Sequence, residues 1–300
     1  MAGLPVTAGR DWLPVATVVA GIVALWYVFA VILNAPWAYD QAGRDGVTLG
    51  PAALVAATLS QERPRLPAPD QVASELWKTT IDVKPTSKRS LVYHAWVTLS
   101  ATLAGFALGT ALGIGLAIAI VHDRTSDASV MPWVIASQTI PILAIAPMIV
   151  VVLNSVGVSG LLPKALISTY LSFFPVAVGM VKGLRSPDRI LMDQMRTWNA
   201  SAGQTFRKLR WPAATPYLFA SLKVAAAASL VGAIVGELPT GAQAGLGARM
   251  LSGSYYGQTV QIWSALFMAA ILAALLVGLI GLAERITVRA MGGRTGREAR

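Results

Sequence analysis

Six long apolar runs, separated by short polar blocks, dominate the pattern of hydrophobic and polar positions along the chain. Each is about 20 residues or longer and nearly free of charge, and a helix needs about this length to cross a hydrocarbon core of about 30 Å. A helix also satisfies its own backbone hydrogen bonds, which lipid cannot do for it. The pattern therefore predicts an all-α polytopic membrane protein with six transmembrane helices, near residues 13–33, 96–121, 132–153, 159–181, 217–237 and 260–283.

The composition supports this interpretation and excludes several others. Of the 300 residues, 55% are hydrophobic and only 13% are charged, whereas a soluble domain carries about 25% charged residues. So few charges cannot cover the two soluble domains that a chain of this length would otherwise form. The sequence contains no cysteine, which excludes disulfides, thiolate metal sites and a cysteine nucleophile.

The basic residues indicate the orientation of the chain. With the N-terminus inside, the predicted cytoplasmic segments hold 14 Lys and Arg residues and the outer segments hold 8. Such an excess marks the cytoplasmic side, and the block 182–210 alone carries seven basic and two acidic residues. We therefore expect both termini in the cytoplasm. The net charge of +10 then marks a membrane face, and no nucleic-acid motif is present.

Two shorter patterns predict local structure. Residues 34–90 are expected to be extracytoplasmic, with Asp70 capping a short amphipathic helix at Gln71–Thr79. In the second span, glycines recur every four residues from Gly105 to Gly113. They give one helix face almost without side chains, which lets helices approach closely, either within the chain or between subunits.

Prolines interrupt the third apolar run at Pro132, Pro141 and Pro147, and Gln138 and Thr139 lie just before the second of them. Interior prolines free carbonyl groups and kink a helix, which is tolerated where a neighbour or a cavity satisfies those groups. Gln138, Thr139 and Pro141 are therefore candidate residues of a translocation path. A kink with a purely structural role is the alternative.

Few ionisable side chains lie within the spans. Glu237, at the end of the fifth span, is a further candidate for the path because an ionisable group in a membrane segment is a functional candidate by default. Lys223 is expected to extend toward the cytoplasmic headgroups. His94 and His122 are 28 residues apart, about 42 Å along one helix. We therefore predict no metal site and place both histidines at the membrane interface.

The basic loop before the fifth span predicts a helix, a turn and a second short helix. Asn199 suits the left-handed position that ends a helix, and Ser201 can cap the next one. In the second helix Phe206 and Leu209 would share an apolar face among basic residues, and Pro212 and Pro216 would end it and start the fifth span. A short apolar and basic element on the cytoplasmic side is typical of a docking site for a soluble partner.

In its spacing this loop resembles the coupling loop of the integral-membrane permeases of binding-protein-dependent ABC importers. The family pattern is Glu-Ala-Ala, three residues, Gly, nine residues, an aliphatic residue, one residue and Leu-Pro. Asp193 stands at the Glu position, Asn199 at the Gly, Leu209 at the aliphatic residue, and Trp211-Pro212 at Leu-Pro. Gln and Met replace the two alanines. Asn tolerates the positive φ of the Gly, and Asp keeps the charge of Glu with a shorter reach.

Further segments resemble the nitrate/sulfonate/taurine branch of that family, and the resemblance covers about residues 60–285. They are Leu66-Pro67-Ala68-Pro69, Gly105 to Gly109, Ile140 to Pro147, Gly236-Glu237 and Ala244 to Gly247. The resemblance implies a type I ABC importer permease fold at 91–287, with the coupling loop at 188–216. A transmembrane helix with an extracytoplasmic segment would precede it at 1–90, and a basic cytoplasmic tail would follow at 288–300.

The resemblance also implies partners. The chain would lie in the inner (plasma) membrane of a bacterial cell, with a second permease subunit (identical or paralogous), two cytoplasmic ATPases and an extracytoplasmic binding protein. The substrate would be a small anion such as nitrate, a sulfonate or taurine, or a pyrimidine-type vitamin precursor. ATP would be bound and hydrolysed by the partner ATPase, because this chain has no P-loop motif. We expect no cofactor on this chain. The residues expected to contact the ATPase are Asp193, Asn199, Phe206, Leu209, Trp211 and Pro212.

Two other classes of function are open to a membrane protein of this kind. A secondary transporter or channel would need no ATPase, and inverted repeats would favour it, but the two halves of the sequence show no convincing self-similarity. A membrane-embedded enzyme would need a catalytic constellation, and the sequence offers none. We therefore expect a transport protein and not an enzyme.

Overall fold

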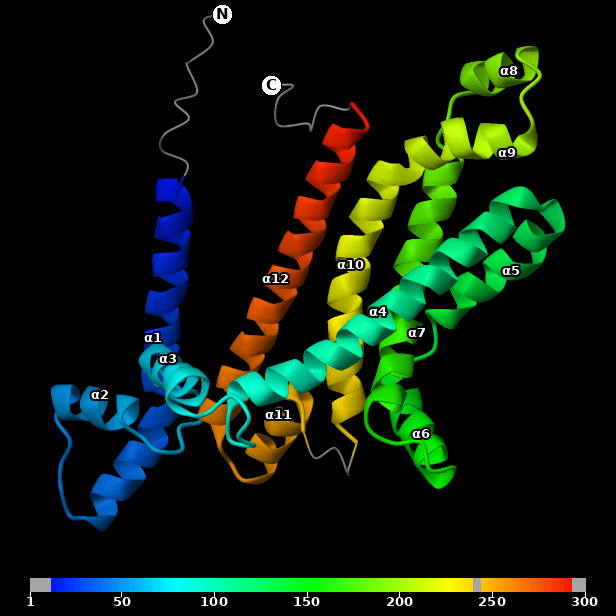
Figure 1. The fold of residues 1–300 in the computed structure, drawn as a ribbon. Coiled ribbons are helices and arrows are strands. Elements are labelled where there is room, and N and C mark those ends of the chain that lie inside the picture. The colour runs from blue at the N-terminus through cyan, green and yellow to red at the C-terminus, as the bar shows by residue number, and fades with distance from the viewer. Residues whose placement is uncertain (1–11, 240–243, 293–300) are drawn as a thin grey trace, which may run out of the picture. The chain divides into compact units, whose positions relative to one another are not determined.

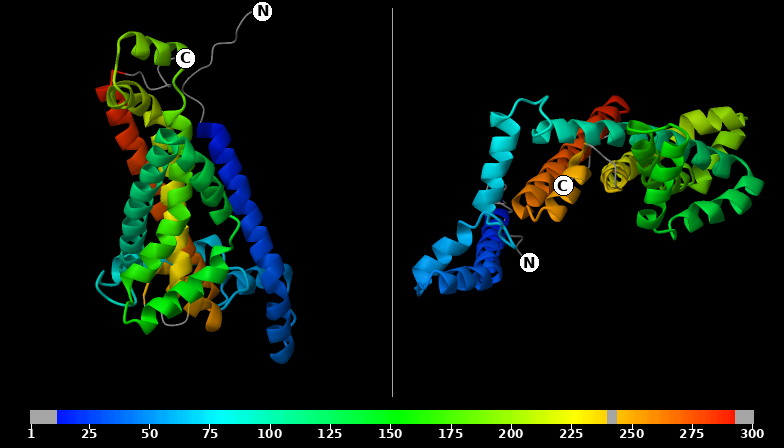
Figure 2. Two further views of the ribbon diagram at one scale, coloured as in Figure 1. Left: turned by 90° about the vertical axis from the view of Figure 1, so that its right-hand side faces the viewer. Right: turned by 90° about the horizontal axis from the view of Figure 1, so that it is seen from below.

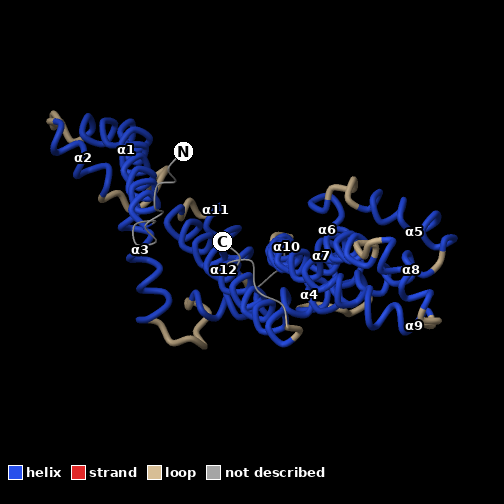
Figure 3. Tube along the Cα trace, turned by 90° about the horizontal axis from the view of Figure 1, so that it is seen from above, coloured by secondary structure: helices blue, strands red, loops and turns tan. Residues whose placement is uncertain are grey.

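A computed structural model describes residues 12–239 and 244–292, and every regular element within these ranges is a helix (Figure 1, Figure 3). A π-helical turn, Lys78–Asp82, follows α3, and another, Phe206–Arg210, joins α9 to α10. The helices are α1 (Trp12–Arg44), α2 (Pro51–Leu59), α3 (Pro69–Trp77), α4 (Leu91–His122), α5 (Arg124–Ser137), α6 (Ile142–Ser155), α7 (Leu161–Leu184), α8 (Arg189–Thr197), α9 (Ala202–Thr205), α10 (Trp211–Glu237), α11 (Leu246–Tyr255) and α12 (Thr259–Ala290).

The predicted membrane spans are confirmed in number when one broken pair is counted as a single span. Among the described residues, five helical segments are long and apolar enough to cross a membrane: α1, α4, α7, the run Ala202–Glu237 and α12. The pair α5 and α6 gives the sixth, bent by 95°. The predicted interruption of the third span by prolines is confirmed, and the chain there breaks into two helices. α5 ends at Ser137 because Pro141 lacks an N–H and disfavours the helical conformation of the residue before it.

The chain forms two compact units. One holds the described residues up to Lys84 together with Met250–Leu266, and the other holds Pro85–Arg249 together with the residues from Phe267 onward. In the first unit α1 continues well beyond the predicted span, to Arg44. The buried side chain of Asn34 in α1 accepts the N–H of Arg65 at 2.8 Å and donates to the carbonyl of Leu66 at 2.9 Å, which fixes the proline-rich segment to this helix.

The cap of α3 differs from the prediction. The side-chain oxygen of Gln71 accepts the N–H of Ala68 at 3.0 Å, so Gln71 and not Asp70 closes the first turn. Asp70 lies within that turn and accepts a hydrogen bond from the Tyr27 hydroxyl at 3.1 Å. The helix begins earlier than predicted because Pro69 has a backbone angle already suited to the first helical position.

Small residues bring α4, α7 and α10 together as the core of the second unit. The glycines from Gly105 to Gly113 face α7, and a Cβ on Gly113 would lie 2.7 Å from the carbonyl oxygen of Phe173. Gly232 of α10 meets α7 in the same way, with a Cβ position 2.7 Å from Cα of Ser168. The glycine face therefore packs within the chain, where it allows close approach of helix backbones.

Polar side chains also join the helices of this unit. Ser168 donates to the carbonyl of Ser229 at 2.8 Å, and Ser229 donates to the carbonyl of Thr102 at 2.8 Å. Lys223 of α10 forms an ion pair with Glu284 of α12, and its expected reach toward the cytoplasmic headgroups stays a prediction. A charge within a membrane segment is costly alone, and a partner on a neighbouring helix reduces that cost.

The second unit has two distinct ends. The ring of His122, at the end of α4, packs against Phe206 with 5.9 Å between the ring centroids. The ends of α4 and α7 and the start of α10 therefore lie together, next to α8 and α9 (Figure 2). The starts of α4 and α7, the end of α6 and the end of α10 lie at the opposite end (Figure 1).

Candidate functional site

At the first of these ends, Asn199 closes α8 with a Schellman motif. Its φ is +50°, its N–H donates to the carbonyl of Arg196 at 2.9 Å, and the N–H of Ala200 donates to the carbonyl of Met195 at 3.0 Å. These bonds satisfy carbonyl groups that a helix end leaves open. The left-handed conformation predicted for Asn199 is confirmed, and Asn adopts it more readily than other side chains do.

The second helix of the loop begins at its predicted cap but does not end as predicted. Ser201 accepts the N–H of Gln204 at 3.3 Å, and the Gln204 side chain accepts the N–H of Ser201 at 2.9 Å. Pro212 starts the fifth span, as predicted, but it does not end the helix before it. α9 continues through the π turn into α10, because Pro212 lies in the first turn of α10, where a missing N–H is tolerated.

Phe206 anchors the loop to the helix core, whereas most of α8 is exposed. Phe206 packs against both His122 and Trp211, at 5.9 Å between ring centroids in each case. No residue of α8 is buried, and Ile190 and Trp198 are 80% and 65% exposed. Large apolar side chains exposed together on a polar loop are typical of an interaction surface.

A hollow of about 440 Å³ separates α8 from the second helix of the loop, and Leu209 lies in its wall with Met195 and Trp198. Asp193 is exposed on α8 and pairs with Arg196 at 3.0 Å. The other predicted contact residues are divided between the end of α8 and the junction with α10: Asn199 at the former, and Phe206, Trp211 and Pro212 at the latter.

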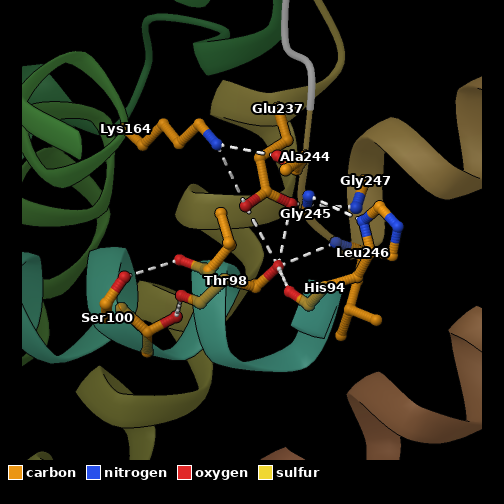
Figure 4. A network of polar contacts seen from close by, with 11 residues as sticks. His94, Thr98, Ser100, Lys164, Glu237, Ala244, Gly245, Leu246 and Gly247 are labelled. Atoms are coloured by element: carbon orange, nitrogen blue, oxygen red, sulfur yellow. Dashed lines mark hydrogen bonds and ion pairs between the residues drawn. The ribbon is translucent and has the colours of Figure 1, made fainter. Parts of the chain in front are cut away.

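At the opposite end of the unit, Glu237 is fully buried within a polar network (Figure 4). Its carboxylate accepts hydrogen bonds from the Thr98 hydroxyl and the N–H of Gly247, both at 2.9 Å, and pairs with Lys164 at 3.5 Å. Lys164 also donates to the carbonyl of Ala244 at 3.0 Å. The buried charge thus has an opposite charge and further donors, which burial of a charge requires.

The turn before α11 is bound to α4 by two more hydrogen bonds. His94 Nδ1 accepts the N–H of Gly245 at 3.0 Å, and the Thr98 oxygen accepts the N–H of Leu246 at 2.8 Å. His94 Nε2 lies 2.9 Å from the carbonyl oxygen of Lys88, so the ring accepts at Nδ1 and donates from Nε2. His94 is therefore a buried member of the network, and its predicted position at the membrane interface stays a prediction.

Two glycines make this close contact possible. Gly245 has a φ of +125°, and a side chain there would overlap the Glu237 carboxylate. A Cβ on Gly247 would lie 2.9 Å from Cβ of Glu237. Glycine is thus required at both positions for the turn to reach the carboxylate. The neighbouring residues 240–243, which the sequence places in the same outer turn, lie outside the described residues.

A cleft of about 470 Å³ opens beside the network. Its volume lies in the range of small-molecule sites, about 300–1,000 Å³. Its walls come from the starts of α4 and α7 and the ends of α6 and α10, with polar groups from Tyr93, Ser100, Asn154, Ser159 and Lys164.

The predicted pathway residues do not come together at this cleft. Glu237 lies behind its wall, whereas Gln138, Thr139 and Pro141 are exposed at the break between α5 and α6 and do not line it. Their role in a translocation path stays a prediction. Lys164 was not among the candidates, although it is the only charged residue in the fourth predicted span and could have been found on that ground.

Comparison with known proteins identifies the family. Residues 109–292 match the family described as binding-protein-dependent transport system inner membrane component. The chain belongs to this family. The riboflavin transport system permease protein RibX of Chloroflexus aurantiacus is 33% identical to this permease over 75% of the chain and 80% of the relative. The formylaminopyrimidine transport permease protein ThiX of Halalkalibacterium halodurans is 32% identical over 61% of this chain and 68% of the relative. Permeases named for aliphatic sulfonates and nitrate also match.

A solved structure has the same fold. The permease matches a chain of the MetNI methionine ABC transporter in an inward-facing conformation, with a TM-score of 0.55 and 21% identity over 67% of this chain and 95% of that chain. The predicted type I ABC importer permease fold is thereby confirmed, as is the resemblance from which it was inferred.

Proposed function

We propose that this permease takes part in ATP-driven import of a small solute and that its loop at 193–212 contacts a cytoplasmic ATPase subunit. The continuity between the exposed loop and the helix core carries the proposal. Phe206 packs on His122 of α4, and the loop continues into α10 without a break. A displacement of the loop would therefore move membrane helices, since packed helices shift as rigid elements.

The rest of the assembly is proposed on the same basis. The family name implies a binding protein on the outer face, and ATP would be held by the ATPase, with no cofactor on this chain. A second permease subunit, identical or paralogous, would complete the path. The excess of basic residues at 182–210 supports cytoplasmic termini in the plasma membrane of a bacterial cell.

The substrate is proposed to be one of two kinds. Relatives are named for riboflavin and formylaminopyrimidine, and others for aliphatic sulfonates and nitrate. A vitamin-type heterocycle and a small anion are therefore the two candidates for this permease. The heterocycle is uncharged and the anion is negative, so charged residues near a binding site can discriminate between the two substrate classes.

Uptake into proteoliposomes that contain the permease with its co-purified ATPase tests the coupling. Asp193→Ala and Leu209→Ala are expected to lower ATP-dependent uptake, and deletion of 200–209 to abolish it. Ile286→Ala, an aliphatic truncation at an exposed position of α12, serves as the control.

Two results would contradict the proposal. One is ATP-dependent uptake by a deletion variant that still inserts in the membrane. The other is uptake without ATP that follows an ion gradient, which would instead establish a secondary transporter.

A further inference from the structure

The cleft beside Glu237 has an arrangement of charges that discriminates among solutes. Among the described residues that line it, Lys164 carries the only charge, and its Nζ lies 3.5 Å from Oε1 of Glu237. The Lys164 side chain is 12% exposed and that of Glu237 is fully buried, so water and salt screen the pair only weakly. The positive charge at the wall of the cleft is therefore largely cancelled by the carboxylate behind it.

An anion gains little in such a cleft. It would be attracted by Lys164 and repelled by Glu237 a short distance behind. Removal of an anion from water is costly unless a cation or several donors compensate for it. The Thr98 hydroxyl and the N–H of Gly247 cannot compensate for it, because both already donate to Glu237.

An uncharged polar solute fits the same groups better. An ammonium group has three donor hydrogens, and Lys164 directs two of them to Glu237 and to the carbonyl of Ala244. The third can meet a carbonyl or ring nitrogen of a solute. Asn154 and Ser159 are exposed in the cleft and offer further donors and acceptors. The faces of a ring would find apolar walls at Val97, Val150 and Leu161.

The position of the cleft suits a site that receives a solute. It lies where α4 and α7 start and α10 ends, at the end of the unit opposite to α8 and α9. In the proposed orientation that end faces the binding protein, while the loop faces the ATPase. A solute released by the binding protein would therefore meet this cleft early in its passage.

We propose that the cleft is a binding site for an uncharged polar heterocycle, and that Glu237 excludes anions from it by neutralising Lys164. The inference rests on the proposed import function and narrows its substrate to the flavin or pyrimidine class.

Equilibrium binding to the permease–ATPase complex in nanodiscs, without nucleotide, tests this with four probes: riboflavin, formylaminopyrimidine, ethanesulfonate and nitrate. One heterocycle is expected to bind at least about tenfold more tightly than either anion, a discrimination that paired polar groups commonly provide. Asn154→Ala is expected to weaken that binding by about fivefold to tenfold. Ser155→Ala, the adjacent exposed position of α6 that does not line the cleft, is the matched control.

Glu237→Gln gives the sharper result because it predicts a gain. Without the carboxylate, Lys164 is uncompensated, and the affinity for ethanesulfonate or nitrate is expected to rise by at least about tenfold. A misfolded variant would not gain affinity, and co-purification with the ATPase checks its folding.

Three outcomes would overturn the assignment: an anion that binds the unmodified complex as tightly as the heterocycles, no saturable binding of any probe, or unchanged anion affinity in Glu237→Gln. Selective binding without ATP-dependent uptake would contradict the proposed function alone. ATP-dependent uptake without selective binding would contradict only the proposed binding site in the cleft.

Discussion

Gly113→Ala in α4 is expected to destabilise the permease relative to Gly115→Ala, two residues along the same helix. Alanine favours a helix over glycine by about 1 kcal/mol at either position. At Gly115 the added Cβ would meet nothing within 4 Å. At Gly113 it would lie 2.7 Å from the carbonyl oxygen of Phe173 and 2.8 Å from Cβ of Val176.

The difference between the two variants isolates the cost of crowding. The propensity gain is common to both and cancels. Overpacking a well-packed contact costs about 1–3 kcal/mol, and a side-chain rotation cannot relieve it here because the Phe173 oxygen belongs to the backbone of α7. Gly113→Ala is therefore expected to be about 1–3 kcal/mol less stable than Gly115→Ala.

Unfolding of the purified permease in mixed micelles, by titration with a denaturing detergent and detection by circular dichroism, measures this difference. Gly115→Ala is expected to be as stable as the unmodified chain or more so, which makes it the matched control. Equal stability of the two alanine variants would refute the reasoning, because it would mean that α4 and α7 are not packed backbone to backbone at Gly113.

Asn199→Gly is expected to leave the loop unchanged, whereas Asn199→Val is expected to destabilise it by about 1–2 kcal/mol, because valine disfavours a φ of +50°. Faster proteolysis of the loop in the Val variant alone would show this, and equal proteolysis rates of the two variants would contradict it. Glu237→Ala is expected to lower the stability by about 3–5 kcal/mol because Lys164, which is largely shielded from water, loses its counter-charge. Replacing both Glu237 and Lys164 with apolar residues is expected to restore part of the stability lost in Glu237→Ala, measured by the same detergent titration. A double variant less stable than Glu237→Ala would argue against the Lys164–Glu237 ion pair. Lys223 and Glu284 are 35% and 26% exposed, so a double-mutant cycle is expected to give a coupling of about 0.5–1 kcal/mol, and a value near zero would contradict the contact.

Local features of the fold could be predicted from the sequence because neighbouring residues determine them. The spans follow from runs of apolar residues, and the turn at Asn199 and the cap at Ser201 follow from the conformations that these side chains favour. The continuation past Pro212 was missed for a local reason too. Proline interrupts a helix interior but is tolerated in a first turn, and the sequence alone does not show which of the two applies.

The polar network could not be predicted in the same way, because its members are far apart along the chain. Gly245 reaches His94 across 151 residues, and Thr98 reaches Glu237 across 139. A histidine near the end of an apolar run has the same local pattern whether it lies at an interface or within a core. Only the packing of α4, α7 and α10 brings its partners into place.

The continuous helix α10 has a mechanical consequence. It spans 27 residues, about 40 Å at the rise of an α-helix, with Trp211 against Phe206 at its start and Glu237 at its end. A single helix thus begins at the base of the loop and ends at the carboxylate that binds the turn before α11. The two ends cannot be displaced along its axis independently, so a push at one end reaches the other within a single stiff element.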